Sequence, residues 1–152
     1  MSLLRFRDSK TLVILRLAVG SLFLGFGIEK LIRPEAWYGW VPSWFTPLLP
    51  VSLATFMFLN GLFEIALGAA LLLGRFTRLA AAAAGLFLFG IILSIGANDV
   101  IFRDSVIMGA CLAIIAEANG TAKKPLSAPA LRRLAMAYAL FVLVLGVLYV
   151  RG

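Results

Sequence analysis

The chain of 152 residues contains no histidine. Histidine is the usual ligand of haem b, a common ligand of zinc and copper, and the side chain that most often moves protons near neutral pH. Its absence excludes such sites and any catalytic triad built on an imidazole. A single cysteine, Cys111, also excludes an intrachain disulfide. We therefore expect no metal site and no cofactor held by the chain alone.

Charged residues are scarce as well, at 14% of the chain, whereas 62% of the residues are hydrophobic and the mean hydropathy is +1.04. These values are typical of an integral membrane protein rather than a soluble domain. The net charge of +7 comes from basic residues at the ends of apolar runs. This placement argues for the lipid bilayer as the partner and against a nucleic acid. A single membrane domain over residues 1–152 is expected.

The apolar runs predict an all-α membrane fold with a four-helix core and a fifth, C-terminal helix. The expected helices cover about residues 11–32, 51–73, 79–97, a fourth that includes 105–116, and 130–150. A short polar loop at residues 98–104 is expected to lead into the fourth helix. The fourth is ambiguous, because its uncharged run holds twelve residues and a span needs ~17–25. If it crosses, Glu117 must lie inside the membrane; the alternative is a re-entrant segment that ends at Glu117.

Five spans place the termini on opposite sides, and the basic residues select the orientation. Nine lie in the segments that are inside if the N-terminus is cytoplasmic, and four lie outside. This split predicts a cytoplasmic N-terminus and an external C-terminus. Residues 34–50 hold all three tryptophans, Trp37, Trp40 and Trp44, on the outer side. They suit an aromatic belt at the headgroups, and a ligand site that includes Trp37 and Trp40 is the alternative.

Small residues share a face with charged ones on the first two helices. At about 100° per residue, one stripe of the first helix holds Arg16 and Lys30 and one of the second holds Glu64. The glycines on these stripes predict close contact between the two helices. They are Gly20, Gly27, Gly61 and Gly68. On the third helix, Gly90, Ser94 and Asn98 predict the packed side.

Each charge inside the membrane costs roughly 2.5–3.5 kcal/mol on insertion scales. Arg16 and Glu117 both lie ~9 Å from the inner surface, and Glu64 lies ~16 Å deep. Depth therefore predicts a structural ion pair between Arg16 and Glu117 and leaves Glu64 with no cation at its level. The alternatives are an Arg16 that reaches the headgroups, an interfacial Glu117, and a protonated Glu64 that hydrogen-bonds to Asn60.

Three motifs resemble the DoxX family. They are LRLAVGSLFLGFGIEKL at 15–31, NGLFEIALGAALLLGRFTRLAA at 60–81, and the pair Arg103-Asp104, with a resemblance over about residues 11–118. The resemblance implies a prokaryotic cell-membrane protein with a four-helix core, so the helix near 130–150 is an addition. The family's namesake is the membrane subunit of a thiosulfate:quinone oxidoreductase, and other members are tied to thiol-oxidant and quinone resistance. The matching positions are Arg16, Lys30, Glu64, Arg103 and Asp104.

Three functions of different classes follow. The first is a membrane subunit of a quinone-linked oxidoreductase system, acting on sulfur or thiol compounds, with a bound quinone and a partner subunit or a second copy. Its pocket would be lined by the catalytic residues Arg16 and Glu64 and by aromatic side chains. Substrate binding would fall to Lys30, Trp37, Trp40, Arg103 and Asp104. The second is a non-catalytic scaffold or assembly subunit, and the third is a small proton-coupled carrier that titrates Glu64.

Overall fold

The computed structural model describes residues 9–96, 98–119 and 126–151. Within these ranges every regular element is a helix, which confirms the all-α fold. In chain order the elements are α1 (Lys10–Ile32), the short 3-10 helices η1 (Pro34–Trp40) and η2 (Thr46–Leu48), α2 (Leu53–Leu72), α3 (Thr77–Ile95), α4 (Asp99–Asn119) and α5 (Ala128–Arg151). Helices α1, α2 and α3 and residues Ala128–Tyr149 of α5 are long and apolar enough to cross a membrane. The protein is therefore a multi-pass membrane protein.

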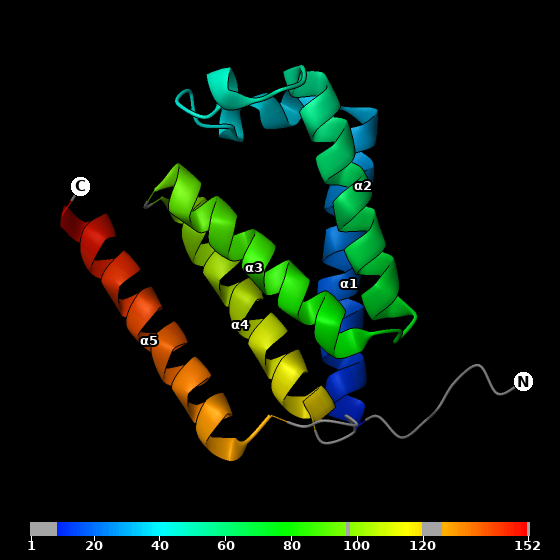
Figure 1. Cartoon of the computed structure of the whole chain (residues 1–152), viewed down its shortest axis with the longest axis vertical. Coiled ribbons are helices and arrows are strands. Elements are labelled where there is room, and N and C mark those ends of the chain that lie inside the picture. Colours follow the sequence, from blue (N-terminus) through cyan, green and yellow to red (C-terminus); the bar gives the residue numbers. More distant parts are fainter. Residues whose placement is uncertain (1–8, 97, 120–125, 152) are drawn as a thin grey trace, which may run out of the picture.

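Helix α4 is less apolar than the others, but it is one continuous helix of 21 residues. At 1.5 Å per residue it is about 31 Å long, and it lies antiparallel beside α3 from one end of the bundle to the other (Figure 1). The structure thus differs from the re-entrant alternative. Residues 99–104, expected in a loop, form the first turns of α4, because Asn98 caps the helix by accepting the Ile101 N–H at 3.1 Å.

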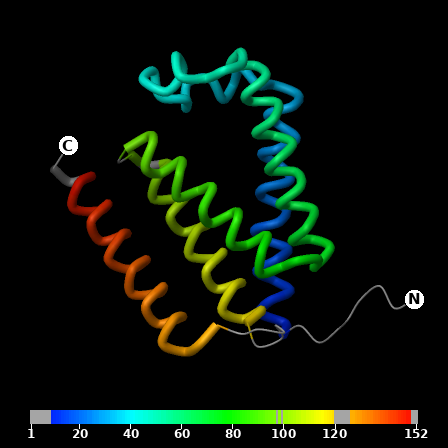
Figure 2. Tube along the Cα trace, viewed as in Figure 1, coloured from blue at the N-terminus to red at the C-terminus, as the bar shows by residue number. Residues whose placement is uncertain are grey.

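The helices form two hairpins, α1–α2 and α3–α4, that meet at one end and diverge at the other (Figure 1). At the closed end, the turn between α2 and α3 is short and has two left-handed residues, Gly74 (φ 67°) and Phe76 (φ 52°). Ser9 also donates a hydrogen bond to the Glu117 carboxylate there, joining α1 to α4. At the open end, the segment with η1 and η2 extends across the gap between the hairpins (Figure 2).

The α1–α2 hairpin packs through two glycine pairs, which confirms the predicted contact. A Cβ atom on Gly27 would lie 2.7 Å from the Gly61 carbonyl oxygen, and one on Gly68 would lie 2.7 Å from the Gly20 carbonyl oxygen. Both distances are shorter than real Cβ contacts, so the backbones approach more closely than any side chain permits. These four residues are called the glycine interface below.

Helix α5 lies outside the four-helix core, beside α4 (Figure 1). The Tyr138 hydroxyl donates to the Ser105 carbonyl at 2.7 Å, and the rings of Phe102 and Tyr149 are 5.0 Å apart. Only 6% of the most apolar stretch of α5 is buried within the protein, against 33% of the corresponding stretch in each of α1, α2 and α3. Most of α5 therefore presents apolar side chains to the lipid.

Candidate functional site

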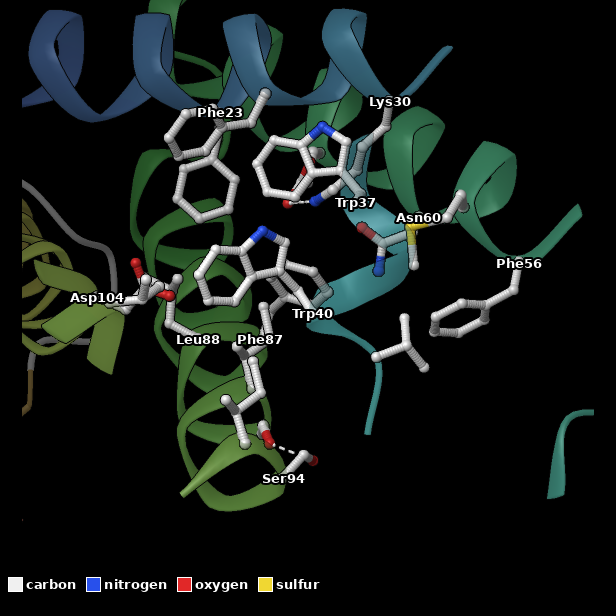
Figure 3. A pocket seen from close by; sticks show the side chains of 18 of the residues that line it. Phe23, Lys30, Trp37, Trp40, Phe56, Asn60, Phe87, Leu88, Ser94 and Asp104 are labelled. Carbon is white, nitrogen blue, oxygen red and sulfur yellow. Dashed lines mark hydrogen bonds and ion pairs between the residues drawn. The ribbon is translucent and has the colours of Figure 1, made fainter. Parts of the chain in front are cut away.

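A cavity of about 410 Å³ lies at the open end, with walls from α1, η1 and the loop after it, α2, α3 and α4 (Figure 3). Six of the seven residues predicted for the site line it. They are Lys30, Trp37, Trp40, Glu64, Arg103 and Asp104. Most of the remaining lining is apolar and includes Phe23, Phe26, Phe45, Phe56 and Phe87. The fold thus gathers residues from positions 22–104 around one chamber.

Lys30 and Glu64 form an ion pair in the wall of this cavity, with 2.6 Å between Nζ and Oε1 (Figure 3). Lys30 is 5% exposed and Glu64 is 3% exposed. The prediction that Glu64 has no cation at its level was wrong. The two Cα positions are about 9 Å apart along the helix axes, because Lys30 lies three residues outward of the Gly27–Gly61 contact and Glu64 three residues inward. Each side chain leans toward its own helix N-terminus, and in antiparallel helices this brings the two together.

The tryptophan of η1 lies against the same lysine. Pro34 ends α1 and begins η1, which turns the chain back over the end of the hairpin. The Trp37 ring centroid is then 4.3 Å from Lys30 Nζ and 5.3 Å from the Phe26 ring, edge to face. A cation over an indole ring is an attractive arrangement of about 0.5–2 kcal/mol. Trp37 is therefore part of the cavity wall and not only of an interfacial belt.

A second ion pair lies on α4. Arg103 Nη2 and Asp104 Oδ1 are 3.0 Å apart, with Asp104 buried and the Arg103 side chain half exposed. The guanidinium carbon of Arg103 is 5.4 Å from the Phe26 ring centroid. Asp104 is also close enough to Lys30 and Glu64 to interact with both charges. The cavity thus holds two positive and two negative side chains, which cancel.

Three buried polar atoms at the cavity have no hydrogen-bond partner in the part of the chain that the structure describes. They are Trp37 Nε1, Asn60 Oδ1 and Glu64 Oε2. Leaving such an atom unsatisfied costs about 1–3 kcal/mol. All three atoms belong to residues that line the cavity, which makes them candidates for hydrogen bonds to a ligand there.

Several residues that line the cavity were not predicted for the site. Asn60 precedes Glu64 by one helical turn, and that spacing was the available signal. Gly90 and Ser94 were predicted on the packed side of α3, but they line the cavity instead. The buried side of α3 holds Ala81, Ala84, Gly85, Leu88 and Ile92. Small residues mark an open chamber as readily as a close helix contact, and the sequence does not distinguish the two.

Arg16 lies outside the cavity, toward the closed end. It is 8% exposed, and its Nε donates to the Leu71 carbonyl at 3.0 Å, beside Gly74 in the turn that follows α2. Basic groups at the C-terminus of a helix satisfy free carbonyls and complement the helix dipole. This position differs from the predicted pocket that holds both Arg16 and Glu64.

The predicted ion pair between Arg16 and Glu117 was also wrong. Glu117 accepts its hydrogen bond from Ser9, and no contact between the two charged groups occurs among the described residues. Ser9 precedes Arg16 by seven residues, or about 10 Å of helix, so Glu117 lies nearer the end of the bundle than assumed. Depth estimated from flanking lysines was not accurate enough to predict the pair.

A sequence model of the DoxX family matches residues 11–97, from α1 to the end of α3. The matched segment contains Lys30, Trp37, Trp40 and Glu64, and it ends before the Arg103–Asp104 pair. No curated protein and no solved structure matches the chain. Because the matched segment covers more than half of the residues, the protein belongs to the DoxX family.

Proposed function

We propose that the protein is the membrane subunit of a quinone-linked oxidoreductase system and that the cavity at the open end is its quinone site. The observation that carries this proposal is the Lys30–Glu64 ion pair in the wall of an aromatic cavity, with Glu64 Oε2 left without a partner among the described residues. An ion pair buried in a membrane protein is expensive and marks a functional site by default.

The size and lining of the cavity suit a single aromatic ring. A volume of about 410 Å³ lies within the range of small-molecule sites, roughly 300–1,000 Å³. Trp37, Trp40 and Phe87 offer ring faces and edges to a planar ligand (Figure 3). The scaffold alternative gives no role to an open chamber of this size, although the glycine interface would serve that alternative equally well.

The charges favour an uncharged ligand. Lys30 and Arg103 are balanced by Glu64 and Asp104, so no net positive charge is available to offset the desolvation of an anion. A neutral quinone ring meets this condition, whereas a sulfur oxyanion does not. In this proposal a sulfur or thiol substrate reacts on a partner subunit, and the present chain handles the quinone.

The exposed residues of the lining indicate the route of entry. Trp40 on η1 and Leu86 and Gly90 on α3 line the cavity and are also exposed. Helix α3 is one of the spanning helices, so this opening faces the bilayer. A lipid-soluble quinone can enter from the membrane with its tail remaining among the acyl chains.

Reduction of a quinone to a quinol takes up two electrons and two protons. The chain has no histidine and one cysteine. The electrons must come from a partner subunit that carries a redox centre or from a soluble reductant, and in this proposal they come from the partner subunit. Glu64 holds a carboxylate oxygen at the cavity and can exchange one of the protons with a ring oxygen. Lys30 positions that carboxylate through Oε1. Arg16, which contacts the end of α2, has a structural role in this proposal.

Filling the cavity should abolish quinone binding. Gly90 is exposed at the cavity, and a Cβ atom added to it would have no neighbouring atom within 4 Å, so Gly90→Leu adds a side chain to the chamber without a clash. We expect the dissociation constant of a decyl-tailed benzoquinone to rise at least about tenfold, since overlap with the ligand costs about 1–3 kcal/mol. Quenching of tryptophan fluorescence in the purified protein measures it.

The matched control is Gly25→Leu, on an exposed face of α1 with nothing within 4 Å and no part in the cavity. It should bind like the unaltered protein. Trp40→Phe should reduce the quenching amplitude more than Trp44→Phe, because Trp44 does not line the cavity. Quenching that never saturates, or that Gly25→Leu and Gly90→Leu change equally, would refute the quinone site.

We further propose that the protein lies in the prokaryotic cell membrane with its N-terminus in the cytoplasm and α5 ending outside, as the nine-to-four split of basic residues favours. In a Cys111→Ala background, a membrane-impermeant maleimide should label Gly39→Cys and Arg151→Cys in intact cells. Arg75→Cys, in the turn between α2 and α3, should react only after permeabilisation. Labelling of positions 75 and 151 from the same side would contradict five spans.

A further inference from the structure

The three unpartnered atoms at the cavity define the hydrogen bonds that a ligand must make. The indole Nε1–H of Trp37 is a donor only, whereas the ionised carboxylate oxygen of Glu64 and the amide oxygen of Asn60 are acceptors. The second carboxylate oxygen of Glu64 already accepts from Lys30 at 2.6 Å. Among the buried side-chain atoms of the lining residues that make no hydrogen bond to the described protein groups, one is therefore a donor and two are acceptors.

An oxidised quinone does not match this pattern. Its two ring oxygens are carbonyls, which accept hydrogen bonds but donate none, so it can satisfy Trp37 and must leave Glu64 Oε2 and Asn60 Oδ1 buried and unpaired. A quinol has two hydroxyl groups, and each can donate one hydrogen bond and accept another. The two hydroxyl groups together can therefore accept from Trp37 and donate to Glu64 and Asn60.

From this mismatch we infer that the cavity binds the reduced, hydroxylated ring of a quinol more tightly than the oxidised quinone. The inference rests on the proposed quinone site and deepens it. A hydrogen bond to a charged group contributes about 1.5–3 kcal/mol, so the quinol should bind roughly tenfold or more tightly than the quinone.

The preference has a direct redox consequence. Tighter binding of the reduced form raises the midpoint potential of the bound two-electron couple, by about 30 mV for each tenfold difference in affinity. A bound quinone is then a stronger electron acceptor than a quinone free in the bilayer. The site therefore favours the reaction in which the quinone takes two electrons from the partner subunit and two protons and becomes a quinol.

The ion pair also predicts how replacing Glu64 with glutamine, which has the same shape, would change ligand affinity. In Glu64→Gln the amide oxygen must face Lys30, because the ammonium group has donors only. The amide nitrogen then occupies the position of Oε2 and donates into the cavity. This variant replaces an acceptor with a donor, so it should bind the quinone more tightly and the quinol less tightly than the unaltered protein.

The test is calorimetric titration of the full-length protein in lipid nanodiscs under anoxic conditions. The probes are a decyl-tailed benzoquinone, its hydroquinone, and the dimethyl ether of that hydroquinone, which keeps the ring but has no O–H group. The hydroquinone should bind at least about tenfold more tightly than either of the others. Equal or tighter binding of the quinone overturns the inference and leaves the quinone site standing, whereas no binding of any probe refutes the proposed function itself.

Variants of the lining residues test which side chains cause the preference for the quinol. Glu64→Gln should reduce the ratio of quinol to quinone affinity at least about tenfold, and Trp37→Phe should weaken both forms alike, because both offer an acceptor oxygen to the indole. Asn60→Leu is the second test if Glu64→Gln does not reach the membrane, and it should lower the ratio as well. A ratio that neither Glu64→Gln nor Asn60→Leu changes overturns the inference.

Discussion

Replacing Lys30 with methionine should lower the free energy of unfolding by about 3–5 kcal/mol, the usual cost of removing one partner of a buried ion pair. The methionine fills a similar volume, so the loss comes from Glu64, which is 3% exposed and would be left buried without its counter-ion. For a chain of this length the loss corresponds to a fall of roughly 6–20 °C in the unfolding midpoint. Thermal unfolding in mild detergent, with membrane abundance measured in parallel, gives the result.

The double variant Lys30→Met/Glu64→Leu removes both charges and should recover most of the lost stability, since buried ion pairs are often replaceable by apolar residues. It should nevertheless fail to bind the quinol. The matched control is Arg33→Met, which breaks an exposed i, i+4 pair with Glu29 (3.2 Å) and should cost less than about 1 kcal/mol. A double variant no more stable than Lys30→Met would show that the pair is not the cause.

The second large effect is expected at the glycine interface. Gly27→Leu places a Cβ atom 2.7 Å from the Gly61 carbonyl oxygen and 2.9 Å from the Ile65 amide nitrogen. Both are backbone atoms, so no side-chain rotation relieves the overlap, and α1 and α2 must separate. Overpacking of a core usually costs about 1–3 kcal/mol and more where the neighbour is rigid, so we expect at least about 3 kcal/mol or loss of the folded protein. Detergent stability measures this loss.

Gly25→Leu is the matched control, two residues away on the exposed face of α1 with nothing within 4 Å. It should leave stability within about 0.5 kcal/mol of the unaltered protein. Separation of the two helices should also weaken ligand binding in any Gly27→Leu protein that survives, because Lys30 and Glu64 lie on opposite helices. Equal stability of the Gly25 and Gly27 variants would contradict the close backbone approach.

The sequence was sufficient to predict the helices and the glycine interface, because both depend on periodic patterns along single segments. Hydropathy predicts where a helix crosses, and glycines seven residues apart on each of two helices predict their contact. The sequence was insufficient for the Lys30–Glu64 ion pair between α1 and α2. That pair depends on the relative register of the two helices and on the direction in which long side chains lean. The lean of both side chains closes a separation of about 9 Å between the two Cα positions along the helix axes.

The start of α4 was missed for a similar reason. Asp99, Arg103 and Asp104 are typical of a loop, yet they form helical turns because Asn98 caps them and because Asp104 is buried beside Arg103 at the cavity. The cavity itself has no signature in the sequence. It is a space between two hairpins, and its position depends on the angle between them rather than on any one motif.

The angle between the two hairpins determines how far apart they are at the open end. The two hairpins are fastened at one end by the short turn after α2 and by the hydrogen bond from Ser9 to Glu117, and they are apart at the other. Over the 23 residues of α1, about 34 Å at 1.5 Å per residue, a rotation of roughly 3° about the fastened end shifts the far end by almost 2 Å. That displacement is comparable with half the thickness of an aromatic ring. The width available to a ligand therefore depends on the angle at the closed end, where Gly74, Phe76, Ser9 and Glu117 lie, although none of the four lines the cavity.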